Sequence, residues 1–289
     1  MEVKYAFIIN PNAGVKKKIN IEEFIISNLP KTVNYEIIIW KDAHDVQSVL
    51  SKISIGNFSH VIACGGDGTV NMVASAVVNS PMALGILPLG SGNGLARSNG
   101  IPMDLKNALN VIVKGNTKTI DSGTINGNHF FCTAGIGFDA LIAHKFATST
   151  KRGFITYFKT SIKEFFNYTP QNYSLQIDDI KLTTDAFLIT IANAGQWGND
   201  VYIAPAAKLD DGLFHISILK PFPKFSILSF GIKLITKKVN TFKYMLSHIG
   251  RKISIQFKGE LVAHYDGEPF IIKEELTIEM HPMSLNIIC

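Results

Sequence analysis

The sequence predicts an α/β protein whose N-terminal part holds a mostly parallel sheet and whose C-terminal part is β-rich and mostly antiparallel. Two observations predict this class. Apolar runs alternate with helical patterns over residues 1–120, and the pattern then changes to apolar runs separated by Gly and Asn turns. With 289 residues, 46% of them apolar and 18% charged, the chain is long enough to bury a large core and too apolar to be disordered.

Each N-terminal element is predicted from an apolar run or a helical period. The expected strands are 3–10, 35–40, 60–64 and 83–88, and the expected helices are 21–29, 46–53, 70–78 and 104–114. Asp104 is the expected N-cap of the last helix. Because strands joined by helical crossovers run parallel, these strands are expected in one parallel sheet.

The C-terminal part begins with a hairpin signal. Residues 119–125 and 129–134 are β-rich and flank an Asn-Gly-Asn turn, which is typical of a hairpin. The further expected strands are 173–177, 186–192, 213–219, 252–257, 260–264, 269–272 and 275–280, and helices are expected over 139–167 and 224–244. The change of pattern places a domain boundary at residue 121, with domains 1–121 and 122–280.

The same sequence predicts a cytoplasmic protein. Its apolar stretches fall short of the roughly 18 to 20 residues that a membrane span needs, and its first residues show no signal-peptide pattern. Cys64, Cys132 and Cys289 are scattered singly and are interpreted as small core residues. A disulfide framework and a structural zinc site are therefore not expected.

The net charge of +5 is unevenly distributed. Residues 220–252 contain eight basic residues and no acidic residue, interleaved with Phe, Leu, Ile and Tyr. This composition suits a surface that meets an anionic membrane, and a solvated helix face over a core is the alternative. No recognised nucleic-acid motif accompanies the charge, so no nucleic-acid partner is expected.

A phosphate site is predicted where residues 65–69 read Gly-Gly-Asp-Gly-Thr between a buried strand and a helix. Glycines allow backbone N–H groups to approach phosphate oxygens, and the following helix contributes its positive end. Asp67 would repel a phosphate unless a divalent cation lies between them, which implies Mg²⁺. The alternative is a buried turn without a ligand.

Two further loops follow other strands of the same predicted sheet. Residues 10–14 read Asn-Pro-Asn-Ala-Gly, and residues 88–94 read Pro-Leu-Gly-Ser-Gly-Asn-Gly. Because the carboxyl ends of parallel strands meet at one edge, we expect these loops to line a single ligand crevice. Neither loop matches the P-loop, and the dinucleotide-binding glycine pattern is absent after the first strand.

Carboxylates elsewhere suggest roles in catalysis or metal binding. Phosphorylation of a hydroxyl needs a proton acceptor, and Glu268, in an Asp-Gly-Glu run, is the first candidate, with Asp67 second. A simple hairpin turn is the alternative at Glu268. Asp210 and Asp211 either cap a turn or hold a divalent cation, and Asp139 is either a helix N-cap or a polar anchor for a substrate head group.

In this order the motifs resemble those of the lipid kinase superfamily that includes diacylglycerol kinases, sphingosine kinases and compact bacterial lipid kinases. The matching segments are 10–14, 65–71, 88–97, 135–139, 205–213 and 266–268, which are spread over nearly the whole chain. The resemblance implies an N-terminal three-layer nucleotide-binding α/β domain, a C-terminal β-sandwich domain and a last strand at 285–288 that returns to the first domain. Residues 281–289 would then complete that domain.

The resemblance also implies roles for individual residues. Asp67 would belong to the Mg²⁺–ATP network and Glu268 would deprotonate the lipid hydroxyl, while Asp211, with the carbonyl of Leu213, would hold a second, structural Mg²⁺. The residues expected to bind ATP are Asn10, Asn12, Gly65, Gly66, Gly68, Thr69, Gly90, Ser91 and Asn93. Asp139 and Arg97 are expected to contact the lipid, and Asp210 is expected to contribute to the second metal site.

The resulting hypothesis is an ATP- and Mg²⁺-dependent lipid kinase that acts peripherally at an anionic membrane. The sequence leaves open whether the protein forms a homodimer. Gly94 stands where the diacylglycerol branch usually has Asp, which favours a sphingoid or other non-diacylglycerol lipid. The alternatives are an NAD kinase, which shares the Gly-Gly-Asp-Gly loop, and a non-catalytic nucleotide- or lipid-binding protein of the same fold.

Overall fold

The computed structural model describes residues 3–11, 19–40, 45–147 and 154–289. The chain divides into two compact units. Unit 1 comprises Met1–Ile120 and Met283–Cys289, and unit 2 comprises Asp121–Pro282. Each unit has its own sheets and helices and is described by itself.

Unit 1 is built on a parallel sheet. Its strands are β1 (Lys4–Ile9), β2 (Asn34–Ile39), β3 (His60–Gly65), β4 (Ala83–Pro88) and the end of β16 (Leu276–Ile288), and they are paired in the order β2-β1-β3-β4-β16. The central strands β1 and β3 are almost completely buried, as expected for parallel strands covered on both faces. The strand order reverses between β1 and β3, which is where open α/β sheets bind ligands.

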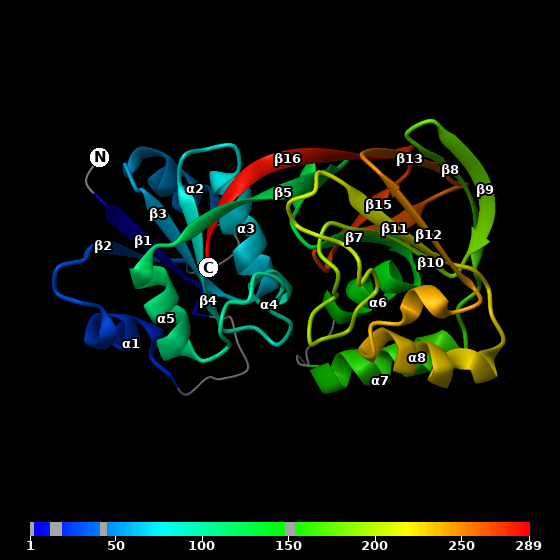
Figure 1. Cartoon of the computed structure of the whole chain (residues 1–289), viewed down its shortest axis with the longest axis horizontal. Helices are drawn as coiled ribbons and strands as arrows, with labels where there is room; N and C mark the ends of the chain where they lie inside the picture. The colour runs from blue at the N-terminus through cyan, green and yellow to red at the C-terminus, as the bar shows by residue number, and fades with distance from the viewer. Residues whose placement is uncertain (1–2, 12–18, 41–44, 148–153) are drawn as a thin grey trace. The chain divides into compact units, whose positions relative to one another are not determined.

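Helices cover both faces of this sheet. They are α1 (Ile21–Asn28), α2 (Val46–Ile55), α3 (Asp67–Val77), the short α4 (Gly94–Ser98) and α5 (Leu105–Lys114). Figure 1 shows α2 and α3 on one face and α1 and α5 on the other, so unit 1 has three layers. Asp104 caps α5 as predicted, because its side chain accepts the N–H of Asn107.

Unit 2 is a sandwich of two antiparallel layers. The first layer contains β7 (Thr133–Gly137), β10 (Leu188–Ala192), β11 (Phe214–Leu219), β12 (Met245–Gly250), β14 (Leu261–Tyr265) and β15 (Glu268–Ile272), in the order β12-β11-β10-β7-β14-β15. The second pairs the start of β16 with β13 (Lys252–Gln256), β8 (Gln171–Ile177) and β9 (Ile180–Ala186). Buried residues of both layers, among them Ile136, Tyr173 and Phe214, form one core.

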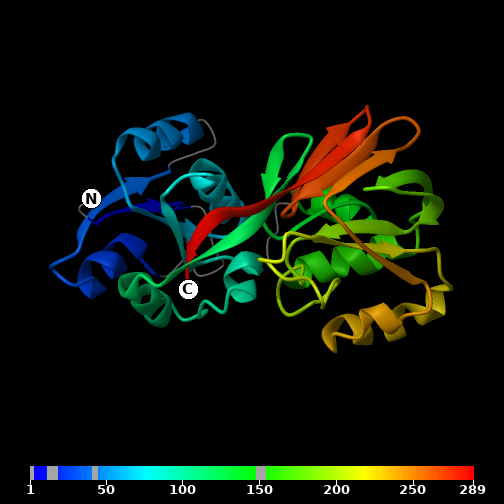
Figure 2. The same cartoon turned by 45° about the horizontal axis from the view of Figure 1, so that its top comes forward.

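The remaining elements of unit 2 are a hairpin and a set of helices. The hairpin joins β5 (Thr117–Ile125), which begins in unit 1, to β6 (Asn128–Phe130) through the predicted Asn-Gly turn. Helix α6 (Phe138–Ala147) packs against β7, β14, β15 and α7 (Phe154–Phe165), and α8 (Ile227–Ile235) lies between the 3₁₀ turns Lys224–Ser226 and Val239–Thr241. Figure 2 shows α8, in yellow to orange, on the outside of unit 2.

The structure confirms the predicted fold class and corrects several element boundaries. The helix expected over 139–167 is two helices, α6 and α7, and residues 148–153 between them lie outside the described residues. The helix expected over 224–244 is only α8, because Lys237 adopts φ of 59°, which a right-handed helix cannot continue through. Strands β9 and β12 were not expected. No helix among the described residues is long and apolar enough to cross a membrane.

Candidate active site

The predicted phosphate loop lies where β3 ends and α3 begins. Gly65 is the last residue of β3, Gly66 is the N-cap of α3, and Asp67, Gly68 and Thr69 form its first turn. The N-cap Gly66 has no side chain, and none of the described residues makes a side-chain cap at this end of α3. The first N–H groups of α3 therefore have no intrahelical partner. These are the groups that bind anions at helix N-termini.

Asp67 connects this loop to the next one. One carboxylate oxygen accepts the backbone N–H of Asn93 at 3.0 Å, and the other accepts the backbone N–H of Gly94 at 2.7 Å. Asn93 in turn adopts the left-handed conformation, with φ of 51°. Its side chain closes the loop after β4 by bonding the N–H of Gly90 at 3.0 Å and the carbonyl of Gly90 at 2.8 Å.

Because Gly66, Gly90 and Gly92 have no side chains, the two loops can approach each other closely. A Cβ on Gly90 would lie 2.7 Å from the Cα of Gly66 and 2.8 Å from Oδ1 of Asn93. A Cβ on Gly92 would lie 2.7 Å from an Asp67 carboxylate oxygen. Both positions therefore need glycine for lack of space.

The remaining predicted residues of unit 1 lie around these loops. The side-chain N–H of Asn10, after β1, donates to the Thr69 hydroxyl at 3.0 Å. Arg97 on α4 donates from Nε to the carbonyl of Gly92 at 3.1 Å, and Ser91 is exposed. The loops after β1, β3 and β4 are therefore joined within unit 1. Asn12 lies outside the described residues.

The donor set around Asp67 fits a magnesium ion that arrives with a nucleotide. Each Asp67 oxygen accepts one N–H and has a further lone pair for a cation. Among the described residues no group of three or more His, Cys, Asp and Glu side chains could hold a metal by itself. Mg²⁺ is commonly bound through one or two carboxylates together with substrate phosphates, so Asp67 fits that arrangement and an all-protein cage does not.

The turn at 210–213, before β11, is held largely by local bonds. Asp211 accepts the N–H of Leu213 at 3.1 Å, and Asp210 and Asp211 are exposed. Gly212 donates its N–H at 2.7 Å to Asp121, which is completely buried. The capping geometry is thus present at Asp211, and the second metal stays a prediction. Asp121 was missed in the sequence, because a single acid in a β-rich run has no pattern of its own.

Glu268 is the first residue of β15 and follows a tight hairpin turn. Asp266 and Gly267 have φ of 47° and 87°, as in a type I′ turn, and Tyr265 pairs with Glu268. The Asp266 carboxylate accepts the N–H groups of three consecutive residues, Phe131, Cys132 and Thr133, at 2.9, 2.8 and 3.0 Å. Glu268 is exposed, and burial together with the Glu268 and Asp266 charges raises the pKa of Tyr265.

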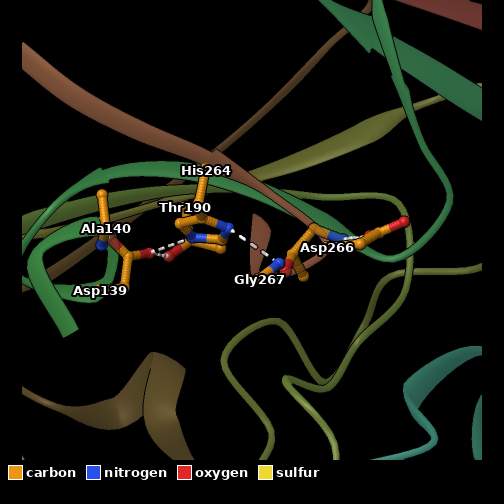
Figure 3. A network of polar contacts seen from close by, with 7 residues as sticks. Asp139, Ala140, Thr190, His264, Asp266 and Gly267 are labelled. Atoms are coloured by element: carbon orange, nitrogen blue, oxygen red, sulfur yellow. Dashed lines mark hydrogen bonds and ion pairs between the residues drawn. The ribbon is translucent and has the colours of Figure 1, made fainter. Parts of the chain in front are cut away.

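Asp139 belongs to a buried polar network that reaches this turn through His264 (Figure 3). One of its oxygens accepts the Thr190 hydroxyl at 2.8 Å and lies 3.3 Å from Nε2 of His264, and the other accepts the N–H of Ala140 at 2.9 Å. His264 also accepts, at Nδ1, the N–H of Gly267 at 3.4 Å. His264 was not singled out in the sequence, because one His in an apolar strand has no pattern of its own.

The predicted core position is confirmed for Cys64 and Cys132, whereas Cys289 is only partly buried. Cys64 and Cys132 are buried and, like Cys289, free of disulfides. Burial raises the pKa of the Cys64 thiol far above its usual range, so this thiol does not ionise to a nucleophilic thiolate at neutral pH.

Two family models match the chain. The diacylglycerol kinase catalytic domain matches residues 4–125, and the YegS C-terminal NAD kinase beta sandwich-like domain matches residues 132–289. The second match covers more than half of the chain, and the two together span both units.

Similar proteins carry the same family name. A Chromohalobacter salexigens protein described as "probable lipid kinase YegS-like" is 32% identical over 64% of this chain and 61% of its own length. A Yersinia pestis protein with the same description is 34% identical over 56% of this chain and 57% of its own length. The matched segment thus spans about three fifths of these relatives.

Solved structures share the fold. A crystal structure described as a diacylglycerol kinase from Bacillus anthracis has a TM-score of 0.75 at 21% identity, covering 99% of this chain and 96% of that one. An NAD kinase from Archaeoglobus fulgidus has a TM-score of only 0.55 at 13% identity, covering 99% and 94%. At these identities the likeness concerns the fold alone. The family matches confirm the resemblance seen in the motifs: the chain belongs to the family in which a diacylglycerol kinase catalytic domain is followed by the YegS C-terminal β-sandwich-like domain.

Proposed function

We propose that this protein transfers the γ-phosphate of ATP to a hydroxyl group of a lipid in the presence of Mg²⁺. The observation that carries the proposal is the pair of glycine loops locked together by Asp67 at the uncapped start of α3. Such an end offers N–H donors and a positive dipole to phosphates. Membership of the lipid kinase family supports a lipid as the acceptor.

The residues have separate tasks in this reaction. The first turn of α3 binds phosphate oxygens, and Asp67 orients the loop after β4. Asp67, together with the nucleotide phosphates, would hold Mg²⁺, which would supply positive charge against the phosphates. Glu268 accepts the proton of the lipid hydroxyl while the lipid oxygen bonds to the γ-phosphorus and the bond from that phosphorus to the ADP oxygen breaks.

Replacement of Glu268 by Gln tests the proposed base. The amide keeps the size of the side chain but accepts protons poorly, so turnover should fall by roughly 10² to 10⁴ while ATP binding stays near normal. The measurement is transfer of labelled phosphate from ATP with Mg²⁺, together with direct ATP titration. Glu274→Gln is the matched control, because Glu274 is an exposed carboxylate of the same unit.

The acceptors in that assay separate the candidate functions. Diacylglycerol, sphingosine, ceramide and NAD are offered separately, because Gly94 favours a non-diacylglycerol lipid. Label in a lipid supports the proposal and identifies its branch. Label only in NADP would establish an NAD kinase instead, and wild-type turnover in Glu268→Gln would remove Glu268 from the mechanism.

We further propose that α8 and its flanking residues form the face that meets an anionic membrane. Four large apolar side chains at helical spacing are exposed: Phe225 by 85%, Leu228 by 72%, Ile232 by 54% and Ile235 by 67%. On the opposite side of α8, Phe230 and Leu234 are buried in a Phe-rich cluster. The outward face is therefore apolar, which a solvated helix would not need.

The charges around α8 favour lipid over a second copy of the chain. Lys224 precedes the helix, and Lys237 and Lys238 follow it, all exposed. A two-fold dimer through this face would place these like charges against one another, whereas anionic head groups complement them.

Serine at Leu228, Ile232 and Ile235 tests the membrane face. Vesicles containing phosphatidylglycerol should retain wild-type protein, and the triple variant should bind about tenfold or more weakly, because each buried CH₂ contributes about 0.8 kcal/mol. The control replaces Ile249 and Ile271 by Ser, since both are similarly exposed elsewhere in unit 2. Equal vesicle binding of the wild type and the triple variant at low salt would refute the proposed membrane face. A lower molar mass of the triple variant in solution would show that this face is a dimer interface instead.

A further inference from the structure

We propose that His264, held by Asp139, is a positioning residue that sets the turn carrying Glu268. The proposal rests on the role of Glu268 in the proposed function. Three buried side chains from different elements meet here: Asp139 from α6, Thr190 from β10 and His264 from β14. Figure 3 shows His264 between Asp139 and the Gly267 backbone.

The contacts of the His264 ring define its tautomer. Nδ1 accepts the N–H of Gly267, and a backbone N–H can only donate. The ring proton therefore lies on Nε2, which faces the Asp139 carboxylate at 3.3 Å. Asp139 thus keeps the imidazole in the one neutral form whose Nδ1 accepts from the turn, the arrangement by which a buried carboxylate orients a His elsewhere.

The space around the pair is closed. A Cβ on Gly135 of β7 would lie 2.5 Å from an Asp139 oxygen and 2.9 Å from Nε2 of His264. His264 is 4% exposed and Asp139 is 6% exposed. The ring therefore has little room to rotate away, and its orientation is passed on to Gly267.

Hydrogen bonds fix both central residues of the turn, Asp266 and Gly267. Asp266 is fixed by the N–H groups of Phe131, Cys132 and Thr133, and Gly267 is fixed by His264. Glu268 follows directly in the chain. Loss of the second support removes the hydrogen bond of the peptide between Asp266 and Gly267, one residue before Glu268. The turn can then shift, and small displacements of a catalytic group are costly for turnover.

Two conservative substitutions of His264 separate its two hydrogen bonds. An Asn side chain places an amide oxygen near the position of Nδ1, so His264→Asn keeps the acceptor for Gly267 and loses the donor to Asp139. A Gln side chain places its amide near the position of Nε2, so His264→Gln keeps the donor and loses the acceptor.

Replacement of Asp139 by Asn tests the tautomer. The Ala140 N–H can only donate, so the Asn oxygen stays there and its NH₂ faces Nε2 of His264. The ring proton then moves to Nδ1, where it opposes the N–H of Gly267. Asp139→Asn should therefore resemble His264→Gln although it leaves His264 in place.

Steady-state kinetics with the lipid acceptor give the first readout. His264→Gln and Asp139→Asn should lower kcat by about 10-fold to 100-fold, His264→Asn should keep most of it, and KM for ATP should stay unchanged in all three, since the ATP loops belong to unit 1. His248→Asn on β12 is the control. If the role of His264 were purely structural, the kcat values of the variants would follow their melting temperatures instead. Equal kcat in His264→Asn and His264→Gln would overturn the proposal.

Nuclear magnetic resonance gives a second readout that needs no activity. The imidazole ¹⁵N shifts should show an unprotonated Nδ1 in the wild type and the other tautomer in Asp139→Asn. Amide exchange at Gly267 should be faster in His264→Gln and Asp139→Asn than in His264→Asn. Unchanged exchange of the Gly267 amide in His264→Gln and Asp139→Asn would refute the contact. If exchange changes in these variants but the wild-type protein phosphorylates no lipid, the proposed function is rejected and His264 remains the support of the turn.

Discussion

Gly66 and Gly90 allow two loops to approach closely, and a Cβ on Gly90 would overlap the Cα of Gly66. Gly90 contacts the backbone of Gly66 and the side chain of Asn93, and the Asp67 carboxylate lies beside Gly92. The absence of side chains at these positions leaves the backbone N–H groups at the start of α3 accessible to phosphate oxygens.

Alanine at Gly90 should therefore weaken nucleotide binding. Its Cβ would overlap the Gly66 Cα, and forced overlaps of this kind cost about 1–3 kcal/mol, so Kd for ATP should rise about tenfold. Calorimetric titration with ATP and Mg²⁺ measures this change. Gly231→Ala is the control, because a Cβ there meets nothing within 4 Å; equal ATP affinity of Gly90→Ala and wild type would refute the loop geometry.

Residues in local motifs could be predicted from the sequence, whereas residues in long-range pairs could not. The glycine loops and Asp67 stand out because spacing and residue type are visible within a few positions. His264 and Asp139 are far apart in the sequence, and each has an ordinary local reading as a core residue or a helix cap. Only the pairing of β14 with β7, which carries the chain into α6, reveals their contact.

At the scale of elements, β16 belongs to both units. Leu276 to Glu279 pair with β13 in unit 2, and Asn286 and Ile287 pair with β4 in unit 1. Leu285, Ile287 and Ile288 are completely buried. The end of this strand therefore covers the β4 edge of the parallel sheet and contributes to its core.

Truncation of Ile287 to Ala should destabilise unit 1. Loss of a buried Ile side chain costs about 2–5 kcal/mol. Trp40 lies in unit 1 and Trp197 in unit 2, and these are the two Trp residues of the chain. In a Trp197→Phe background, urea unfolding followed by Trp40 fluorescence should shift to lower concentration. Ile249→Ala, at an exposed position of β12, is the control; an unshifted Ile287→Ala curve would contradict the role of β16.

The strands that were not predicted from the sequence, β9 and β12, lack a clear apolar strand pattern. β9 reads Ile-Lys-Leu-Thr-Thr-Asp-Ala and is half exposed at the edge of its layer, so it carries little apolar signal. β12 follows a basic apolar stretch whose periodicity resembles a helix. Parallel strands such as β3 and β4 were predicted well, because burial on both faces gives continuous apolar runs.

At the scale of the whole molecule, the α/β class follows from the order of the elements. Alternating strands and helices predict the parallel sheet of unit 1, and β-rich runs separated by Gly and Asn turns predict antiparallel pairing in unit 2. The sandwich was implied by the family resemblance, since the assignment of antiparallel strands to two layers depends on contacts between residues distant in sequence.

The order of synthesis adds a constraint to this architecture. The ribosome makes β1 to β4 first, but the strand that covers the β4 edge comes only after all of unit 2. While unit 2 emerges, the nascent chain presents an open apolar edge, which is prone to intermolecular pairing. The sheet of unit 1 is therefore completed only after translation of residues 283–289, and a product interrupted before them keeps this edge open for aggregation.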